Sequence, residues 1–238
     1  MAAADDKSLP DFDSSELGTK EFWDTTYGKE VENFNDIGDV GEIWFGEETM
    51  EKVADWLENC ADVHTDDPII DLGSGNGMMC IELCKRGFTR LTGVDYSELA
   101  VMLSKSVASS EGFGNIEFET GDLISEERPN PCTCLTRKYK VVLDKGTYDA
   151  ISLMPGDSVS ARMHYLATVK ELMTSDGIFS ITSCNWTKDQ LLEFFKEHFT
   201  LHDEIKFKTI QFGGVTGSTY TSLILKQTYS DTYVLQQT

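Results

Sequence analysis

The stretch PIIDLGSGNG, residues 68–77, constrains the fold more than any other part of the chain. An apolar run ends at Asp71, and glycines follow at positions 73, 75 and 77. Because glycine adopts positive φ angles and has no side chain, it allows a sharp turn and the close approach of a ligand. The pattern predicts a short buried strand, a tight turn and a helix. In open parallel sheets, ligands bind beyond the carboxyl ends of the strands, where this turn would lie.

Strands and helices are predicted to alternate from residue 68 onward. Apolar segments typical of strands lie at residues 68–73, 90–97, 115–122, 139–146 and 177–185. Helix-length segments lie at residues 77–87, 98–112, 160–177 and 187–199. This alternation favours right-handed βαβ units, and hence an α/β fold with a mostly parallel, Rossmann-like sheet and helices on both faces. Residues 201–228 predict two more strands, one of them antiparallel at the sheet edge. The segment 125–138 interrupts the rhythm and is predicted to be an exposed, mobile loop.

The residues before the alternating region form a predicted tail and a predicted helical cap. Residues 1–18 are acidic and poor in apolar side chains, which indicates disorder. Residues 19–34 and the amphipathic segment 47–60 are both predicted to be helices. We therefore expect a disordered acidic tail (1–18) and a single domain (19–238) that begins with a helical cap (19–60).

Two more carboxylates mark the ends of predicted strands. Asp95 lies 20 residues after Gly75, a position from which a carboxylate accepts hydrogen bonds from the two ribose hydroxyls of an adenosine cofactor. Asp122 and the Leu123 backbone end the third strand and are placed to meet an adenine edge. The structural alternatives are a strand-to-helix turn without a ligand and a turn-capping role for Asp122.

The spacing of the glycines separates two kinds of adenosine cofactor. A dinucleotide loop reads G-x-G-x-x-G, whereas this chain reads G-x-G-x-G after an acid, Asp71. That acid would repel a diphosphate but suits the sulfonium and amino group of S-adenosylmethionine. S-adenosylmethionine is therefore favoured over NAD. The candidate cofactor-binding residues are Asp71, Gly73, Ser74, Gly75, Asn76, Gly77, Asp95, Tyr96, Asp122 and Leu123.

Taken together, these motifs resemble those of a known family. IIDLGSGNG, GVDYS and GDL follow one another, and the fourth predicted strand ends in VVLDKGTYDAI. Residues 68–227 resemble the class I S-adenosylmethionine-dependent methyltransferases. The segment DKGTYDA is similar to the D-K-G-T-x-D-A signature of a eukaryotic protein-lysine methyltransferase group. With FWDTTYGKEVENF and GEIWFGEE upstream, all but the first 18 residues resemble the translation elongation factor 1-alpha lysine methyltransferases of the methyltransferase-like family.

The resemblance implies a seven-stranded sheet with its last strand antiparallel, and S-adenosylmethionine as the cofactor. It also implies methyl transfer to one lysine of translation elongation factor 1-alpha, a basic and cytoplasmic GTPase. We therefore expect a cytoplasmic, monomeric enzyme with a basic protein substrate. The target lysine and the number of methyl groups transferred do not follow from the motifs.

The end of the fourth predicted strand bears on the methyl acceptor. Enzymes that methylate planar amides or amino-adenines often carry an Asn/Asp-Pro-Pro-Tyr-type segment there, whereas this chain carries LDKGTYD. A lysine acceptor has a free pKa of about 10.4, so its neutral amine costs roughly 4–5 kcal/mol at pH 7 unless the site lowers that pKa. Desolvation by aromatic walls lowers the pKa, and a carboxylate orients the amine. No strong general base is required, because the proton can leave to water.

These requirements select candidate residues for the acceptor side of the site. We predict that Asp144 orients the amine, and we assign Tyr148 a catalytic role beside it. The candidate channel residues are Trp23, Tyr27, Trp44, Phe45 and Lys145. For each aromatic residue, ordinary core packing is the alternative. Tyr148 and Asp149 could pack beneath the sheet, and Lys145 could form a salt bridge.

Charge and cysteine content exclude several classes of function. The net charge of −21 repels nucleic acids and anionic lipid surfaces, and the chain has no apolar run of about 18 residues. We therefore expect neither nucleic acid nor membrane as a partner. Residues 1–60 hold 17 acidic and 4 basic residues, which is either a solvated surface or a dock for a basic partner. The cysteines are scattered, and the pair Cys132-x-Cys134 lacks further ligands in the sequence, so no metal is predicted and a reduced compartment is expected.

Three other functions remain open at this level. A methyltransferase acting on a small molecule is compatible with the acidic surface. A catalytically silent module that binds S-adenosylmethionine belongs to a different class, and the full set of cofactor motifs argues against it. A nicotinamide-dependent dehydrogenase is disfavoured by the spacing of the glycines.

Overall fold

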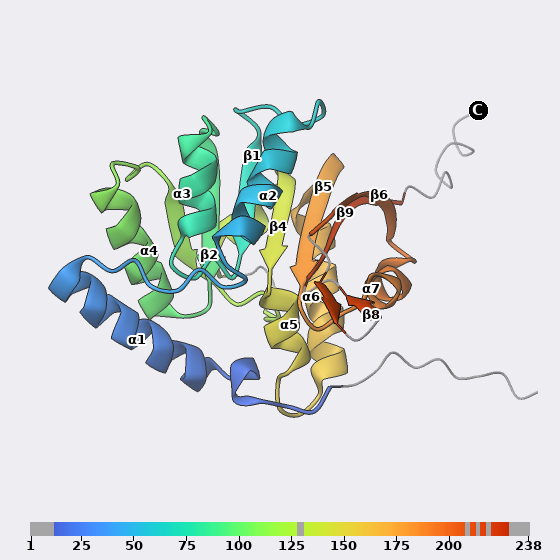
Figure 1. Cartoon of the computed structure of the whole chain (residues 1–238), viewed down its shortest axis with the longest axis horizontal. Helices are drawn as coiled ribbons and strands as arrows, with labels where there is room; N and C mark the ends of the chain where they lie inside the picture. The colour runs from blue at the N-terminus through green and yellow to red at the C-terminus, as the bar shows by residue number, and fades with distance from the viewer. Residues whose placement is uncertain (1–11, 128–130, 208–209, 213–214, 218–219, 229–238) are drawn as a thin grey trace, which may run out of the picture.

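The computed structural model describes residues 12–127, 131–207, 210–212, 215–217 and 220–228. Seven strands form one mixed sheet at the centre of the molecule (Figure 1). They are β1 Pro68–Leu72, β2 Arg90–Asp95, β3 Glu117–Thr120, β4 Tyr139–Lys145, β5 Met173–Ser183, β6 Phe199–Ile205 and β9 Thr221–Gln227. Two short strands pair in a separate hairpin, β7 Ile210–Phe212 with β8 Val215–Gly217.

The strand order across the sheet is β3-β2-β1-β4-β5-β9-β6. Strand β1 is parallel to β2 and β4, and β9 is antiparallel to both β5 and β6. Six strands therefore run in one direction, which confirms the predicted mixed, mostly parallel sheet. The reversed strand lies one place inside the edge rather than at it. A crossover through a helix brings β6 in parallel to β5 and leaves between them the space that β9 fills.

Helices cover both faces of the sheet (Figure 1). They are η1 Glu16–Gly18, α1 Lys20–Ile37, α2 Glu47–Asn59, α3 Met78–Lys85, α4 Glu98–Ser110, η2 Thr133–Thr136, α5 Thr147–Ser152, α6 Ser158–Leu172 and α7 Lys188–Phe195. Because side chains alternate along a strand, Ile69 packs with α2, α3 and α4, whereas Ile70 packs with α5, α6 and α7. Among the described residues, no helix has the length and apolar character needed to cross a membrane.

Helix α1 lies beyond the carboxyl ends of the strands (Figure 1). Its N-cap is Thr19, whose side chain accepts a hydrogen bond from Phe22 N at 3.3 Å. The Ser97 hydroxyl at the start of α4 donates to Asp24 Oδ1 at 2.6 Å. Through this contact the predicted helical cap is fixed at the same edge of the sheet as the glycine turn.

The predicted disordered tail is corrected for residues 12–18, while residues 1–11 lie outside the described part of the chain. Phe12 packs edge-on against Trp186 with ring centroids 4.7 Å apart. Ser15 N donates to Leu153 O at 3.1 Å, and the one-turn helix η1 follows. The acidic composition hid this order, because one aromatic contact and one backbone hydrogen bond to distant residues hold the segment.

Two further segments differ from the prediction. Within the predicted exposed loop, residues 133–136 form η2 with Cys134 and Leu135 buried, whereas residues 128–130 lie outside the described residues. The sequence analysis also missed α5, a six-residue helix directly after β4. Gly146 adopts a φ of 94° and ends the strand, so the residues of DKGTYDA after it are helical.

Candidate active site

A cavity of about 440 Å³ opens at the carboxyl ends of the parallel strands. Its walls include the residues that end or follow five neighbouring strands, β3, β2, β1, β4 and β5. The remaining wall comes from η1, α1 and the segment before α2. This volume is typical of small-molecule and cofactor sites. The cavity therefore lies where the glycine motif predicted a ligand.

The glycine turn forms one end of the cavity. Gly73, Gly75 and Gly77 all have positive φ angles, of 65°, 54° and 78°. A Cβ atom at Gly73 would lie 2.1 Å from Thr147 Oγ1, and one at Gly75 would lie 2.7 Å from the Tyr27 hydroxyl. These positions therefore need glycine for both backbone conformation and space.

The predicted turn residues divide into two groups. Gly73, Ser74 and Asn76 line the cavity. Gly75 and Gly77 are absent from its lining and shape the turn from behind it. The Asn76 amide donates to Val40 O and Glu42 O at 3.1 Å each, so the turn is tied to the segment before α2.

Asp95, at the end of β2, is held rigidly against the glycine turn. Its Oδ2 accepts from Gly75 N at 3.0 Å and its Oδ1 accepts from Ser97 N at 2.9 Å. Burial raises its pKa to about 6, while these two hydrogen bonds oppose the shift. The residue lines the cavity. Because an ionised carboxylate can accept about four hydrogen bonds, it retains capacity for ligand hydroxyls.

Asp71 and Lys145 lie beneath the glycine turn, where both line a small adjoining cavity of about 20 Å³. Burial raises the pKa of Asp71 to about 7, and the Lys145 ammonium partly opposes that shift. Burial lowers the pKa of Lys145, whose Nζ donates to Trp44 O at 2.7 Å. Lys145 also lines the 440 Å³ cavity, whereas Asp71 does not.

The wall after β3 contains the predicted adenine-side residues. Asp122 and Leu123 line the cavity together with Tyr96 and Gly121. Asp122 Oδ1 accepts from Ile124 N at 3.0 Å, which is the turn-capping contact expected as its structural alternative. Capping does not remove Asp122 from the cavity, so the two roles are compatible.

An aromatic wall from the N-terminal cap faces the strand ends. Trp23, Tyr27, Trp44 and Phe45 all line the cavity, and Trp23 and Trp44 meet edge-on with ring centroids 4.9 Å apart. Phe45 has a φ of 68°, which places a bulky residue in the strained left-handed region. Its ring stacks on Tyr220 at 5.0 Å and lies 5.8 Å from Lys145 Nζ. The structure thus brings together every predicted channel residue.

The two predicted catalytic residues do not reach the cavity. Asp144 points to the opposite face of β4 from Lys145, where it accepts from Thr147 N at 3.0 Å, from Tyr148 N at 2.9 Å and from the Tyr165 hydroxyl. Tyr148 is fully buried between Tyr165 and Trp186, with ring centroids 5.5 Å from each. The geometry contradicts both assignments, because strand alternation turns Asp144 beneath the sheet and α5 carries Tyr148 into the core.

A different carboxylate faces the cavity at this position. Asp149, in α5, is 5% exposed and lines the cavity between Thr147 and Ala150. It accepts from the Ser183 hydroxyl at 2.5 Å and from Cys184 N at 2.8 Å. Burial raises its pKa, and these hydrogen bonds oppose the shift. The arrangement fixes a carboxylate between the ends of β4 and β5.

Two buried polar atoms of the cavity wall have no hydrogen-bond partner among the described residues. They are Ser74 Oγ on the glycine turn and Trp44 Nε1 on the aromatic wall. A buried donor without a partner costs about 1–3 kcal/mol, so such atoms indicate a place for a ligand acceptor. Together with the open glycine turn, they fit a polar cofactor that carries a carboxylate and hydroxyl groups.

Several lining residues were missed by the sequence analysis. Asn185 and Cys184 follow β5 and could have been found by the same strand-end rule that selected Asp95. Asp149 lies within the DKGTYDA motif, but its helical setting was not foreseen. Leu17 and Gly18 had no signal in the sequence. A Cβ atom at Gly18 would lie 2.2 Å from the Leu153 carbonyl, so the backbone of η1 packs directly on the end of α5.

The fold agrees with comparisons to known proteins. The family model described as a methyltransferase domain matches residues 63–232. EEF1A lysine methyltransferase 2 of Danio rerio is 48% identical over 218 residues, which cover 92% of this chain and 91% of that protein. Protein-lysine N-methyltransferase EFM4 of Saccharomyces cerevisiae is 38% identical over 226 residues, which cover 90% of this chain and 95% of that protein.

Solved structures show the same fold at low identity. A TehB-like SAM-dependent methyltransferase from Corynebacterium glutamicum has a TM-score of 0.58 and 17% identity, covering 86% of this chain and 98% of that one. Magnesium protoporphyrin IX methyltransferase from Synechocystis, solved with bound SAM, has a TM-score of 0.55 and 18% identity, covering 84% and 96%.

Proposed function

The chain belongs to the methyltransferase family that includes EEF1A lysine methyltransferase 2 and EFM4, and we propose that it is an S-adenosylmethionine-dependent protein-lysine N-methyltransferase acting on translation elongation factor 1-alpha. The observation that carries the proposal is that one continuous cavity joins two kinds of wall. The strand ends supply cofactor-type groups and the Asp149 carboxylate, and the N-terminal cap supplies an aromatic wall. This is the combination that a lysine acceptor requires.

When bound, S-adenosylmethionine supplies a methyl group activated by attachment to a sulfonium. Asp95 would hold the ribose hydroxyls, and the wall of Asp122 and Leu123 would hold the adenine. Asp71 and Lys145 would bind the amino and carboxylate groups of the methionine tail. The Ser74 hydroxyl and the Trp44 indole N–H are further donors for that carboxylate.

The chain's own contribution on the acceptor side is desolvation and orientation. Aromatic side chains exclude water and lower the pKa of the incoming lysine, so more of it is present as the neutral amine. We propose that Asp149 orients this amine, in place of the residue predicted from the sequence. Its hydrogen bonds from Ser183 and Cys184 N keep the carboxylate in one position. Proximity and alignment then account for most of the rate enhancement, and the proton leaves to water.

We further propose a cytoplasmic location, shared with the translation factor, and a monomeric state. A net charge of −21 favours a basic protein as the partner and disfavours nucleic acids and anionic membranes.

The test of the proposed function is methyl transfer to purified elongation factor 1-alpha from labelled S-adenosylmethionine. Label should appear in the factor, and mass spectrometry should locate it on one lysine whose replacement by arginine removes it. Label that appears only in the small-molecule pool of a lysate would instead support a small-molecule methyltransferase. Binding of S-adenosylhomocysteine without transfer to any acceptor would support a silent module.

Cofactor affinity is expected to rise with pH. Because the pKa of Asp71 is about 7 and the cofactor carries a net positive charge, binding favours the ionised carboxylate and releases a proton below pH 7. The Kd should therefore fall by about tenfold at most between pH 6 and pH 7, and level off above pH 8. Calorimetric titration across this range measures the effect. The variant Asp71→Asn should bind more weakly but lose this pH dependence, and an unchanged slope in that variant would contradict the assignment.

Substrate affinity is expected to depend on the acidic residues in and beside the segment before α2, of which Glu42 lines the cavity. Five exposed carboxylates lie in or beside the segment that carries Trp44 and Phe45, namely Asp36, Asp39, Glu42, Glu47 and Glu48. Replacing all five by amides should raise the KM for the protein substrate by about tenfold at low salt, with a smaller change in kcat, because charge steers a basic partner. Steady-state kinetics at about 50 and 300 mM salt measure this effect, because added salt screens surface charge.

The matched control removes the same charge from the opposite edge of the sheet. Five exposed acids lie in segments that precede strands or end helices there, namely Asp62, Asp66, Glu111, Glu171 and Glu197. Their replacement should leave KM unchanged. If both five-site variants behave alike, this acidic segment is a solubility feature and not a docking surface.

A further inference from the structure

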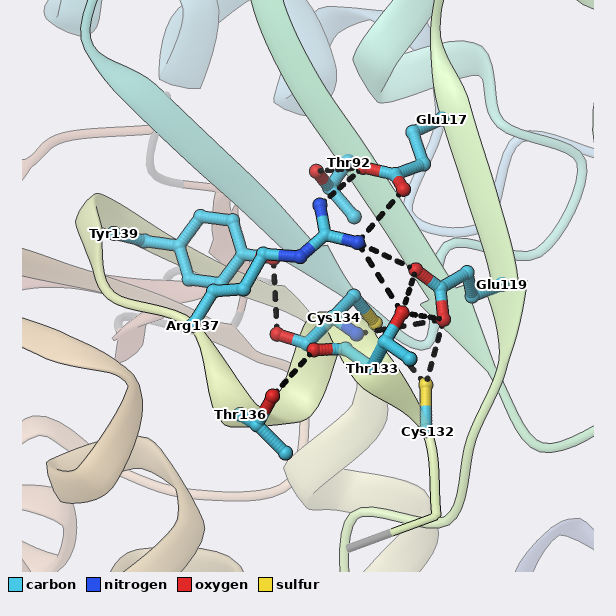
Figure 2. A network of polar contacts seen from close by, with 9 residues as sticks. All are labelled: Thr92, Glu117, Glu119, Cys132, Thr133, Cys134, Thr136, Arg137 and Tyr139. Carbon is cyan, nitrogen blue, oxygen red and sulfur yellow. Dashed lines mark hydrogen bonds and ion pairs between the residues drawn. The ribbon is translucent and has the colours of Figure 1, made fainter.

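Three groups of metal-ligand type converge beside β3 (Figure 2). They are the thiols of Cys132 and Cys134, at the start of η2, and the carboxylate of Glu119 in β3. The two Sγ atoms are 3.2 Å apart, and Cys132 Sγ is 3.5 Å from Glu119 Oε2. One ligand atom from each residue lies within 4.8 Å of the others. The sequence showed only the cysteine pair, because Glu119 is brought to it by the fold.

Neighbouring residues hold the carboxylate in a fixed orientation (Figure 2). Arg137 Nη2 donates to Glu119 Oε1 at 2.8 Å and also binds Glu117. The Thr133 hydroxyl donates to the same carboxylate at 2.8 Å. Glu119 Oε2 is thereby directed at Cys132. Hydrogen bonds that orient ligand side chains in this way are typical of metal sites and contribute to their affinity.

The spacing is close to that of a tetrahedral zinc site. Zn–S bonds of about 2.3 Å and Zn–O bonds of about 2.1 Å imply an S···S separation of about 3.8 Å and an S···O separation of about 3.6 Å. The S···O separation of 3.5 Å already matches. The two thiols must separate by about 0.6 Å, a small change for side chains on a short turn.

The charge balance also suits a divalent cation. Binding of Zn²⁺ requires both thiols to become thiolates, which releases two protons. The two positive charges of the cation replace the two protons that leave, so the net charge of this buried cluster is unchanged. Cys132 is 6% exposed and Cys134 is 0% exposed, whereas the Glu119 side chain is 24% exposed and gives access from solvent.

We propose that Cys132, Cys134 and Glu119 form a binding site for one thiophilic divalent cation of the zinc type, with solvent in the fourth position. A cation bound there would also stabilise the adjacent wall of the cofactor cavity. A Cβ atom at Gly121 would lie 2.7 Å from Cys132 Sγ, and Gly121 lines the cofactor cavity next to Asp122. A cation at the thiols therefore fixes the turn that carries the adenine-side wall.

A disulfide between the two cysteines is the competing use of the same atoms. It requires an oxidant and would need only the two sulfurs. The third ligand and its orientation by Arg137 and Thr133 favour the cation, because a disulfide gives neither of them a role.

The experiment titrates the reduced, chelator-treated full-length chain with Co²⁺ and with Zn²⁺. One equivalent of Co²⁺ should produce the thiolate charge-transfer band and the visible bands of a tetrahedral site, and Zn²⁺ should displace it. The variants Cys132→Ser and Cys134→Ser should lose these bands. Glu119→Gln should weaken binding by about 100-fold and Arg137→Gln by about tenfold. The controls Cys60→Ser and Cys184→Ser should bind as the parent does.

Three results would overturn the proposal. The first is the absence of stoichiometric binding by the reduced chain. The second is binding that survives Cys134→Ser or is lost in Cys184→Ser. The third is unchanged metal affinity in Glu119→Gln. Because glutamine keeps the shape of the glutamate side chain, a loss of binding in this variant is not explained by misfolding. Formation of a Cys132–Cys134 disulfide by a chain that binds no zinc when reduced would assign the pair to thiol oxidation instead.

Discussion

Replacing Asp149 by asparagine is expected to lower kcat for lysine methylation by about 100-fold, with less than about a threefold change in cofactor affinity. The carboxylate faces the cavity beside the end of β4 and is held by Ser183 and Cys184 N. Asparagine keeps the shape but carries no charge, so it neither attracts the lysine ammonium nor orients the amine as strongly. Because this interaction matters most in the transition state, the loss should appear in kcat more than in binding.

Three measurements separate this role from a structural one. Single-turnover kinetics give the rate of methyl transfer, and calorimetry gives the affinity for S-adenosylmethionine. The unfolding free energy of the variant should stay near that of the parent. Asp157→Asn is the matched control, because Asp157 is an exposed N-cap of α6 that does not line the cavity. Equal losses in kcat and cofactor affinity would show that Asp149 serves the cofactor or the fold.

The misassignment of Asp144 shows what a motif leaves out. Both carboxylates belong to DKGTYDA, and the sequence places them only five residues apart. Their directions depend on where β4 ends and α5 begins, which Gly146 decides through a φ of 94°. Alternation along β4 sends Asp144 toward α6, whereas the first turn of α5 brings Asp149 to the cavity. At this point the repeat of side-chain directions changes from two residues in the strand to 3.6 residues in the helix. The sequence alone did not show where that change occurs.

The glycine turn and the strand-end acids were predictable because their signals are local. Glycines at 73, 75 and 77 are needed for positive φ angles, and a strand-ending acid such as Asp95 follows from hydrophobic periodicity alone. The same holds for the alternation of strands and helices. These features depend on a few neighbouring residues, so the sequence contains them directly.

The features that escaped prediction depend on contacts between distant segments. The position of β9 between β5 and β6 is set by pairing across the sheet. The order of residues 12–18 depends on Phe12 meeting Trp186. Likewise, Glu119 joins Cys132 and Cys134 only after β3 and η2 have packed together. No local pattern marks any of these contacts.

Replacing Asp144 is expected to destabilise the fold rather than the reaction. Its carboxylate accepts from two backbone N–H groups at the start of α5, one of them part-buried, and from the buried Tyr165 hydroxyl. Alanine would leave these donors without a partner at about 1–3 kcal/mol each, so the unfolding free energy should fall by about 3 kcal/mol or more. Asparagine retains one acceptor oxygen and should cost less. Urea unfolding measures both variants.

The same carboxyl group should also give stability a specific pH dependence. Burial raises the pKa of Asp144 from 3.8 to about 7 in the folded chain, so between these values the folded state holds a proton that the unfolded state has lost. Stability from this group is therefore largest below pH 4 and falls as pH rises toward 7, by at most about 1.4 kcal/mol per pH unit. Asp144→Asn lacks the titrating group, so its deficit relative to the parent should shrink between pH 5 and pH 8. A deficit that stays constant would mean that Asp144 is ionised throughout this range. A loss of turnover in a fully folded Asp144→Asn protein would instead show that Asp144 takes part in the reaction.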